Sequence, residues 1–281
     1  MDGITISNGR ELLENGTIDR VPVRIEGGTI AGFTEGSDSR TSIDCAGALV
    51  LPGIVDLHGD SFEWHVMPRP RVQFPLDIGL LDNDRALAVN GITTAFLGVA
   101  FSWEPGARGG KSAAATIAHM ADLRGRLGVD TRLHLRFETF NIDGAAGAVS
   151  LIEAGVVDLL AFNDHLGQYE RWVEAGRDRL EPWARQTGLS VPEFIALLRR
   201  TRAREAEVPA TVQGVAQAAR AAAVPLASHD DETPAVREAW QSLGVTIADF
   251  PCSRETARRA RALDNPVVMG APNVLRGASQ D

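Results

Sequence analysis

The sequence contains few cysteines and no excess of basic residues, and both shortages narrow the classes of protein it can represent. Its two cysteines, Cys45 and Cys252, lie far apart, without the close spacing of a zinc ribbon or a disulfide framework. Lys and Arg number 28 against 37 Asp and Glu, so the formal net charge of −9 disfavours non-specific binding to nucleic acid or to an anionic membrane. A phosphorylated small molecule can still bind at a local basic site.

Long apolar runs are also missing. No stretch approaches the ~18 consecutive apolar residues of a membrane span, and the first ten residues, MDGITISNGR, lack the basic and apolar regions of a signal peptide. We therefore expect a cytoplasmic protein that acts on a small molecule, without a nucleic-acid or membrane partner. Assembly into a homo-oligomer is left open.

Two patterns divide the chain near residue 48. Residues 1–48 contain short alternating segments and two turn signals, Asn8-Gly9 and Gly27-Gly28, which predict hairpins of a small β-sandwich module. In residues 49–281, apolar segments alternate with helical patterns, which is typical of βα units in a parallel sheet. Seven segments read as strands: 48–58, 91–101, 131–138, 156–164, 224–230, 244–250 and 266–273. No glycine-rich dinucleotide turn follows the first, so we predict an α/β fold, a (β/α)8 TIM-like barrel whose eighth strand is not visible.

One connection, residues 166–222, is much longer than the others. It contains at least two helical patterns and a helix start signal at Ser190-Val191-Pro192-Glu193. An insertion after a strand of a barrel is expected at the barrel mouth, as a lid or specificity element. Extra scaffold or an interface is an equally good interpretation.

Polar side chains end several of the predicted strands. The carboxyl ends of barrel strands meet at one mouth, so residues distant in sequence should come together there. The candidates are His58, Asp60, Glu138, His165, His229, Asp230 and Asp231. Histidines and carboxylates are ligands for one or two divalent ions. Taken singly, each residue has a structural alternative: Glu138 could pair with Arg136, and Asp230 could cap a helix starting near Thr233.

The segment PRPRVQFP supplies a candidate anion site. Arg69 and Arg71 are flanked by prolines that stiffen the backbone, and arginine forks match phosphate oxygens. We predict that both bind a phosphate, although a solvated basic loop is the alternative. His65, read as a loop residue, is a further candidate for substrate contact.

Several segments together resemble the amidohydrolase superfamily, and within it the alpha-D-ribose 1-methylphosphonate 5-triphosphate diphosphatases of phosphonate degradation. The segments are LPGIVDLHGD, PRP, RLHLRFE, LASHDD and MGAPNVLRG. Most members of the superfamily carry His-x-His on the first barrel strand, where this chain has His58-x-Asp60. The resemblance implies one or two divalent ions, Zn, Mn or Fe, and five metal ligands: His58, Asp60, Glu138, His165 and His229. Glu138 stands where many relatives use a carboxylated lysine, although our strand count places it one strand earlier.

The activity that the resemblance implies is hydrolysis of a ribose 5-triphosphate to the 5-phosphate and pyrophosphate. Asn273 and Arg276 would join the two arginines in holding phosphate or phosphonate oxygens, and Asp230 or Asp231 would take the proton of the attacking water. The resemblance also implies an eighth strand with a metal-binding Asp beyond residue 281, which indicates a fragment or a shortened member. Two alternatives remain open: an amidohydrolase that cleaves a C–N bond of a cyclic amide or nucleobase, and an inactive binding or scaffold homologue.

Overall fold

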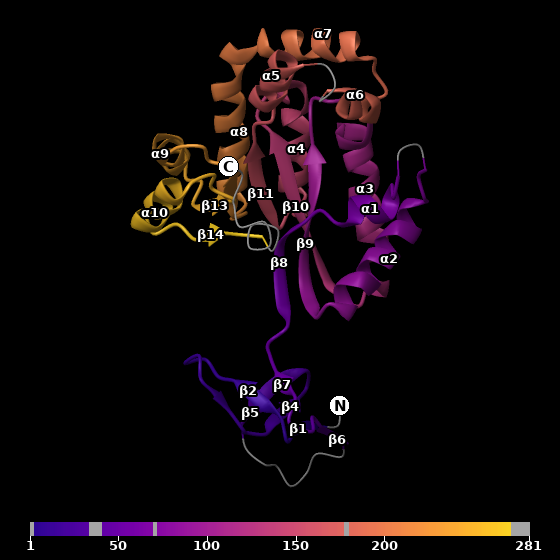
Figure 1. Ribbon diagram of the computed structural model, residues 1–281, viewed down its shortest axis with the longest axis vertical. Coiled ribbons are helices and arrows are strands. Elements are labelled where there is room, and N and C mark those ends of the chain that lie inside the picture. Colours follow the sequence, from indigo (N-terminus) through magenta and orange to yellow (C-terminus); the bar gives the residue numbers. More distant parts are fainter. Residues whose placement is uncertain (1–2, 34–40, 70–71, 177–179, 271–281) are drawn as a thin grey trace. The chain divides into compact units, whose positions relative to one another are not determined.

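The computed structural model describes residues 3–33, 41–69, 72–176 and 180–270. The chain divides into two compact units, Met1–Ile54 and Val55–Asp281. The first unit contains short strands in two small sheets, and the second contains a parallel sheet with helices packed against it (Figure 1).

The first unit consists of a four-stranded and a three-stranded sheet, which confirms the β structure predicted for the N-terminal part. The larger sheet has the order β5-β4-β1-β6, with bounds Thr29–Gly32, Val23–Glu26, Ile4–Ser7 and Thr41–Asp44. The smaller has the order β3-β2-β7, with bounds Ile18–Asp19, Arg10–Leu12 and Leu49–Val50.

One of the two predicted turns closes a hairpin and the other does not. Gly27 and Gly28 have φ angles of +59° and +83°, as a two-residue hairpin turn requires, and they join the antiparallel β4 and β5. The prediction of a hairpin at Asn8-Gly9 is wrong. Because β1 already pairs with β4 on one side and β6 on the other, β2 joins the smaller sheet instead.

Seven strands form the sheet of the second unit, in the order β14-β13-β12-β11-β10-β9-β8. Their bounds are, from β8 to β14, Ile54–Gly59, Ile92–Phe101, Asp130–Glu138, Leu159–Asn163, Leu226–His229, Ile247–Asp249 and Val267–Val268. Strands that follow one another in the chain are neighbours in the sheet, and the strands from β9 to β14 pair in parallel, as in a (β/α) barrel. The predicted fold is confirmed as an incomplete TIM-like barrel, with β8 and β14 at its edges.

The first predicted barrel strand, 48–58, is in fact two strands. Pro52 and Gly53 interrupt it, since proline has no backbone N–H for a sheet ladder and glycine weakens strand structure. The part before them is β7, which pairs with β2 of the first unit, and the part after them is β8.

Side-chain alternation along β10 decides what faces the barrel interior. Three apolar residues of this strand pack in the main core with the covering helices: Leu133, Leu135 and Phe137. The residues between them, His134, Arg136 and Glu138, therefore point to the inside. The helices of that core include α2 (Leu76–Val89), α3 (Gly110–Leu123), α4 (Ala145–Glu153) and α8 (Val208–Ala221).

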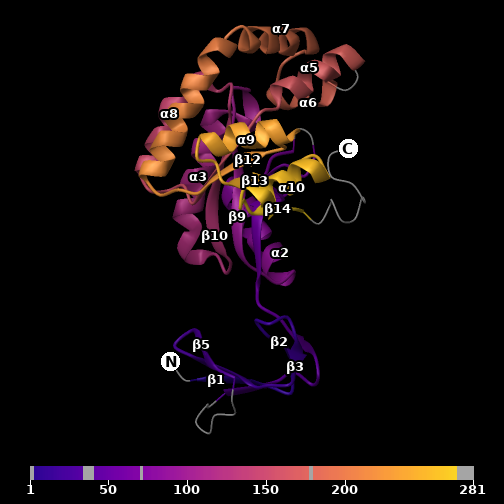
Figure 2. The ribbon, with the colours of Figure 1, turned by 90° about the vertical axis from the view of Figure 1, so that its left-hand side faces the viewer.

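The long insertion forms α5 (Leu166–Ala175), α6 (Glu181–Thr187) and α7 (Val191–Arg202) before α8 returns along the sheet (Figure 2). The predicted start signal is confirmed: Ser190 and Glu193 form a reciprocal capping box at the start of α7. The three helices share a second apolar core, which includes Tyr169, Phe194 and Phe140 of the loop after β10. They lie at the carboxyl ends of the strands (Figure 1). Among the described residues, no helix has the length and apolar character that crossing a membrane would take.

Candidate metal centre

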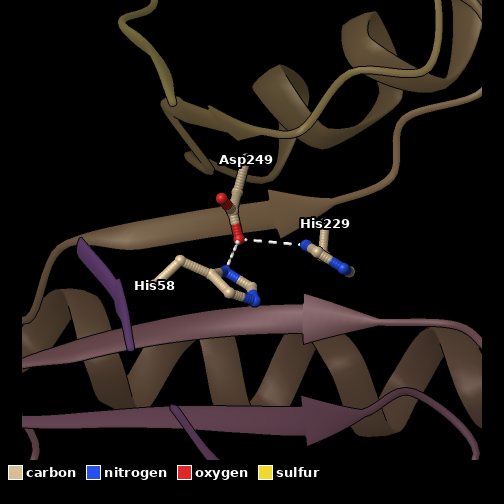
Figure 3. A group of neighbouring side chains, drawn as sticks. All are labelled: His58, His229 and Asp249. Carbon is tan, nitrogen blue, oxygen red and sulfur yellow. Dashed lines mark hydrogen bonds and ion pairs between the residues drawn. The ribbon is translucent and has the colours of Figure 1, made fainter. Parts of the chain in front are cut away.

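Asp249 joins two imidazoles whose strands are far apart in the order of the barrel sheet. Its Oδ2 accepts a hydrogen bond from Nδ1 of His58 at 2.8 Å and from Nδ1 of His229 at 3.0 Å (Figure 3). His58 is on β8, whereas His229 ends β12 and Asp249 ends β13. The two imidazole rings stack with centroids 4.9 Å apart. The curvature of the sheet therefore brings the edge strand β8 back to β12 and β13.

A second carboxylate orients a third imidazole. His165 follows β11 and precedes α5, and its Nδ1 donates to Oε1 of Glu138 at 2.5 Å. The backbone N–H of His165 donates to the other carboxylate oxygen at 3.2 Å. Glu138 ends β10 and is buried. Its two hydrogen bonds therefore hold the ring of His165 in one orientation.

The three imidazoles share one arrangement: Nδ1 donates to a buried carboxylate, and Nε2 carries the lone pair when the ring is neutral. A ligating histidine usually donates its other ring N–H to a carboxylate in this way, which fixes its tautomer and orientation. Two groups of potential ligand atoms lie within 4.8 Å of one another among the described residues: His58, His229 and Asp249, and His165, His229 and Asp230. Imidazole with carboxylate is a donor set for Zn, Mn or Fe.

Asp230 places a carboxylate oxygen opposite one of these lone pairs. It follows β12 with a φ of +58°, a left-handed conformation in which Asp is enriched, and its Oδ2 lies 3.3 Å from Nε2 of His229. Two electron-rich atoms facing each other need a proton or a cation between them. The residues present therefore fit a divalent ion.

Burial and neighbouring charge set the protonation states of the site. Burial lowers the pKa of His229 to about 3, so the ring is neutral and donates to an ionised Asp249. Burial opposes the ionised form of Asp249, but hydrogen bonds from His229 and His58 outweigh it and lower its pKa. Burial raises the pKa of Asp230 to about 6. In contrast, Glu138 raises the pKa of His165 against the effect of burial, and its own pKa falls to about 2.

The structure separates Asp231 from Asp230, although both are candidates to handle the proton of water. The Asp231 carboxylate is buried in an ion pair with Arg237 at 3.1 Å and accepts from Ser228 at 2.9 Å. Asp230 faces the imidazoles instead. Thr233, rather than Asp230, caps α9 (Pro234–Ser242), since its side chain accepts from the N–H of Val236.

Asp60 does not join either group of ligand atoms in the part of the chain that the structure describes. The expectation that it shares a face with His58 assumed a strand through residue 60, but β8 ends at Gly59 and Asp60 is exposed. Glu138 is also outside both groups and orients His165 instead. The ligand roles of Asp60 and Glu138 stay predictions.

The predicted substrate-binding residues are only partly described. His65 lies in the short helix α1 (Phe62–Val66) rather than in a loop, and its Nδ1 is 2.7 Å from Oδ2 of Asp82. Arg69 is exposed and forms an isolated bridge with Val72. Three more fall outside the described residues: Arg71, Asn273 and Arg276. Substrate binding by all five stays a prediction.

Two interior residues were missed from the sequence. Asp249 follows the same rule as His229, because it is the last residue of an apolar strand, and that signal was available. Arg136 has the same parity in β10 as Glu138, which alternation alone predicts to face inward.

Comparison with known proteins gives the family. A scan against models of protein families matched none. The alpha-D-ribose 1-methylphosphonate 5-triphosphate diphosphatase of Escherichia coli strain K12 is 30% identical over 288 residues, covering 98% of this chain and 73% of that protein. The chain belongs to this diphosphatase family of the amidohydrolase superfamily.

Solved structures agree on the fold of the family. A guanine deaminase from C. acetobutylicum matches 99% of the chain and 70% of its own length, with a TM-score of 0.58 and 12% identity. A 5-methylcytosine deaminase from Klebsiella pneumoniae matches 94% of the chain and 64% of its own length, with a TM-score of 0.54 and 13% identity. The chain spans little more than half the length, 56–58%, of three hydantoinases that it matches. At these identities the likeness shows the barrel fold alone.

Proposed function

We propose that this chain is a metal-dependent hydrolase that converts alpha-D-ribose 1-methylphosphonate 5-triphosphate to the 5-phosphate and pyrophosphate. The relative from Escherichia coli, whose name states this substrate, supports the proposal because its likeness covers almost the whole chain. The observation that carries the hydrolytic part is the set of three carboxylate-oriented imidazoles, two of which, His165 and His229, have Asp230 beside them. A cytoplasmic setting and homo-oligomerisation stay predictions from the sequence.

The candidate metal ligands follow from the hydrogen bonds. Nε2 of His58, His165 and His229 is available in each case because Nδ1 is held by a carboxylate, and Asp230 can add an oxygen. A divalent ion bound there supplies charge neutralisation and a more acidic water. Because Asp249 already accepts from Nδ1 of His58 and of His229, the group of His165, His229 and Asp230 is the better placed of the two to hold an ion.

The protein's own groups account for proton handling and orientation. In the net reaction, water adds to phosphorus at the anhydride bond between the first and second phosphates, that P–O bond breaks, and pyrophosphate leaves. The water gives up a proton, and Asp230 is placed to accept it, since its raised pKa makes it a stronger base than an exposed aspartate. Asp249 and Glu138 keep the imidazoles in position throughout.

The rival reaction, cleavage of a C–N bond, is not favoured by the fold. The deaminases share only 12–13% identity with the chain, and a shared barrel does not transfer a substrate. An inactive scaffold would need no oriented imidazoles, so the three imidazoles held by carboxylates in this chain argue for catalysis.

Phosphorus NMR tests the proposal. The chain, and the longest open reading frame that contains it, would be incubated with the ribose triphosphate and Mn²⁺, Zn²⁺ or Fe²⁺. We expect the triphosphate signals to give way to those of pyrophosphate and a monophosphate. Hydrolysis of a dihydropyrimidine or adenine without any turnover of the triphosphate would reject the proposal. Binding of metal and triphosphate with no turnover would favour the scaffold.

A further inference from the structure

Arg136 is a buried cation whose neighbours in the barrel sheet are small residues. On the two strands that pair with β10, the residues directly beside Arg136 are Ala100 of β9 and Ala161 of β11. A Cβ added to Gly98 would lie 2.9 Å from Cδ of Arg136, so this glycine is needed for the side chain to fit. The side chain faces the interior, and the residue is only 7% exposed.

Within the described residues the guanidinium has no hydrogen bond or ion pair, and its Nε is buried without a partner. Burying a charge without a counter-ion is costly. Two carboxylates of the interior hydrogen-bond to imidazoles instead: Asp249 to His58 and His229, and Glu138 to His165. Glu138 and Asp230 interact with Arg136 through their charge, without a hydrogen bond or ion pair to it among the described residues.

Arg237 shows how this chain satisfies a buried arginine that has a structural role. It is fully buried, and its guanidinium donates to the Asp231 carboxylate and to the Ser228 hydroxyl, at 3.1 and 2.9 Å, as well as to two backbone carbonyls. Nε is buried without a partner in both arginines, but only the guanidinium of Arg237 has hydrogen bonds from its terminal nitrogens among the described residues. The barrel therefore holds one arginine that is paired by protein groups and one that is not.

The charge of Arg136 acts on the candidate metal centre. It contributes to lowering the pKa of Glu138 and of His229, and it opposes the rise in the pKa of His165 and of Asp230. The guanidinium thus shares one interior with the imidazoles. A partner that arrives from outside must be an anion small enough to reach this interior.

We propose that Arg136 is an anion-binding residue of this site, and that its fork holds two oxygens of a phosphoryl group beside the candidate metal ligands. Arginine binds such oxygens in a bidentate manner, and the small neighbours leave the fork free to do so. Naming phosphate as the anion rests on the proposed function. A neutral cyclic amide would leave the buried charge unpaired, so Arg136 separates the two candidate reactions.

Calorimetric titration with inorganic phosphate tests the assignment without turnover. The protein would be loaded with Mn²⁺ and freed of unbound metal, and the variants R136Q and R136K compared with it. We expect R136Q to bind phosphate about 10- to 100-fold more weakly, and R136K, which keeps the charge but not the fork, to fall between. The matched control is R132Q, which removes an exposed arginine of the same strand that pairs with Asp130 at 2.7 Å. Its phosphate affinity should equal that of the wild type.

The outcomes separate this inference from the proposed function. Unchanged phosphate affinity in a folded R136Q would overturn the role of Arg136 even if the triphosphate is hydrolysed. Loss of phosphate binding in R136Q, with no triphosphate turnover by the wild type, would support the anion site and reject the proposed reaction. If R136Q does not fold, R136K decides, and wild-type affinity in R136K would also overturn the inference.

Discussion

Oδ2 of Asp249 lies 2.8 Å from Nδ1 of His58, although 191 positions separate the two residues in the sequence. The contact connects β13 with β8, which is an edge strand of the sheet. Because the same oxygen also accepts from His229, one carboxylate sets the tautomer of two candidate metal ligands. Asp249 is therefore the residue on which the geometry of the centre depends most.

Replacing Asp249 should weaken metal binding. In D249A, both imidazoles lose the acceptor of their Nδ1 protons, so the rings are free to rotate and to change tautomer. We expect the affinity for Zn²⁺ or Mn²⁺ to fall about 10- to 100-fold. Competition with a chelating dye, followed by metal analysis of the desalted protein, measures the change.

Asp82 offers a matched control for D249A. It pairs with Nδ1 of His65 at 2.7 Å, the same kind of contact, but neither residue belongs to the groups of ligand atoms found in the described residues. D82A should keep wild-type metal affinity. Equal losses in the two variants, or none in D249A, would show that Asp249 does not orient the ligands.

The Glu138 and His165 pair should make stability depend on pH in the metal-free protein. The pKa of Glu138 falls to about 2 in the folded state, so its contribution is present above the usual value near 4.5 and is lost as the pH falls towards 2. The pKa of His165 is raised, so its contribution is present below about 6.5 and is lost as the pH rises through the folded value. The pair therefore stabilises most between about pH 4.5 and 6.5.

Removing the pair with E138Q should cost about 3–5 kcal/mol of unfolding free energy in that window, because a buried charge loses its partner. Urea denaturation of wild type and variant at several pH values gives the difference. The difference in unfolding free energy between wild type and E138Q should become smaller below about pH 4.5 and above about pH 6.5. E181Q, which breaks the exposed pair of Glu181 with Arg185, should change stability little at any pH. A difference for E138Q that is constant from pH 3 to 9 would contradict the assignment.

The sequence predicted the barrel because its signals are local. Strand and helix patterns alternate, and each strand has only to pair with the next, so seven apolar segments were enough to give the sheet order. The break at Pro52-Gly53 was a local signal too, but the apolar residues around it were read as one strand. The strands that pair with β2 could not be predicted, since both edges of β1 are taken by β4 and β6, which lie further along the chain.

The site was predictable to the extent that strand ends mark it. His58, His165 and His229 follow that rule, and the structure brings them together. Hydrogen-bond partners could not be predicted from the sequence. Whether a carboxylate binds a metal or orients an imidazole depends on small differences in where the side chain lies. Glu138 and Asp249 are of this kind. Alternation could have pointed to Arg136, but the lack of a partner for it is visible only once the whole interior is assembled.

Asp230 is expected to set the dependence of hydrolysis on pH. A carboxylate accepts a proton only when ionised, and burial raises the pKa of Asp230 to about 6 in the metal-free chain. A cation bound beside it favours the ionised form, so kcat/KM should fall on acidification with an apparent pKa at or below 6. In D230N that acid limb should disappear, and the rate should drop about 10²- to 10⁴-fold.

The neighbouring Glu232 provides the control for Asp230. Its side chain is exposed and pairs with Arg171, so E232Q should keep both the rate and the pH profile of the wild type. Metal content must be measured in D230N, because the same carboxylate lies within reach of a cation held by His165 and His229. A variant that keeps its metal and loses its rate assigns Asp230 to proton transfer, since a ligand role alone would remove both together. If D230N keeps its metal and its pH profile still has the acid limb, Asp230 is not the general base.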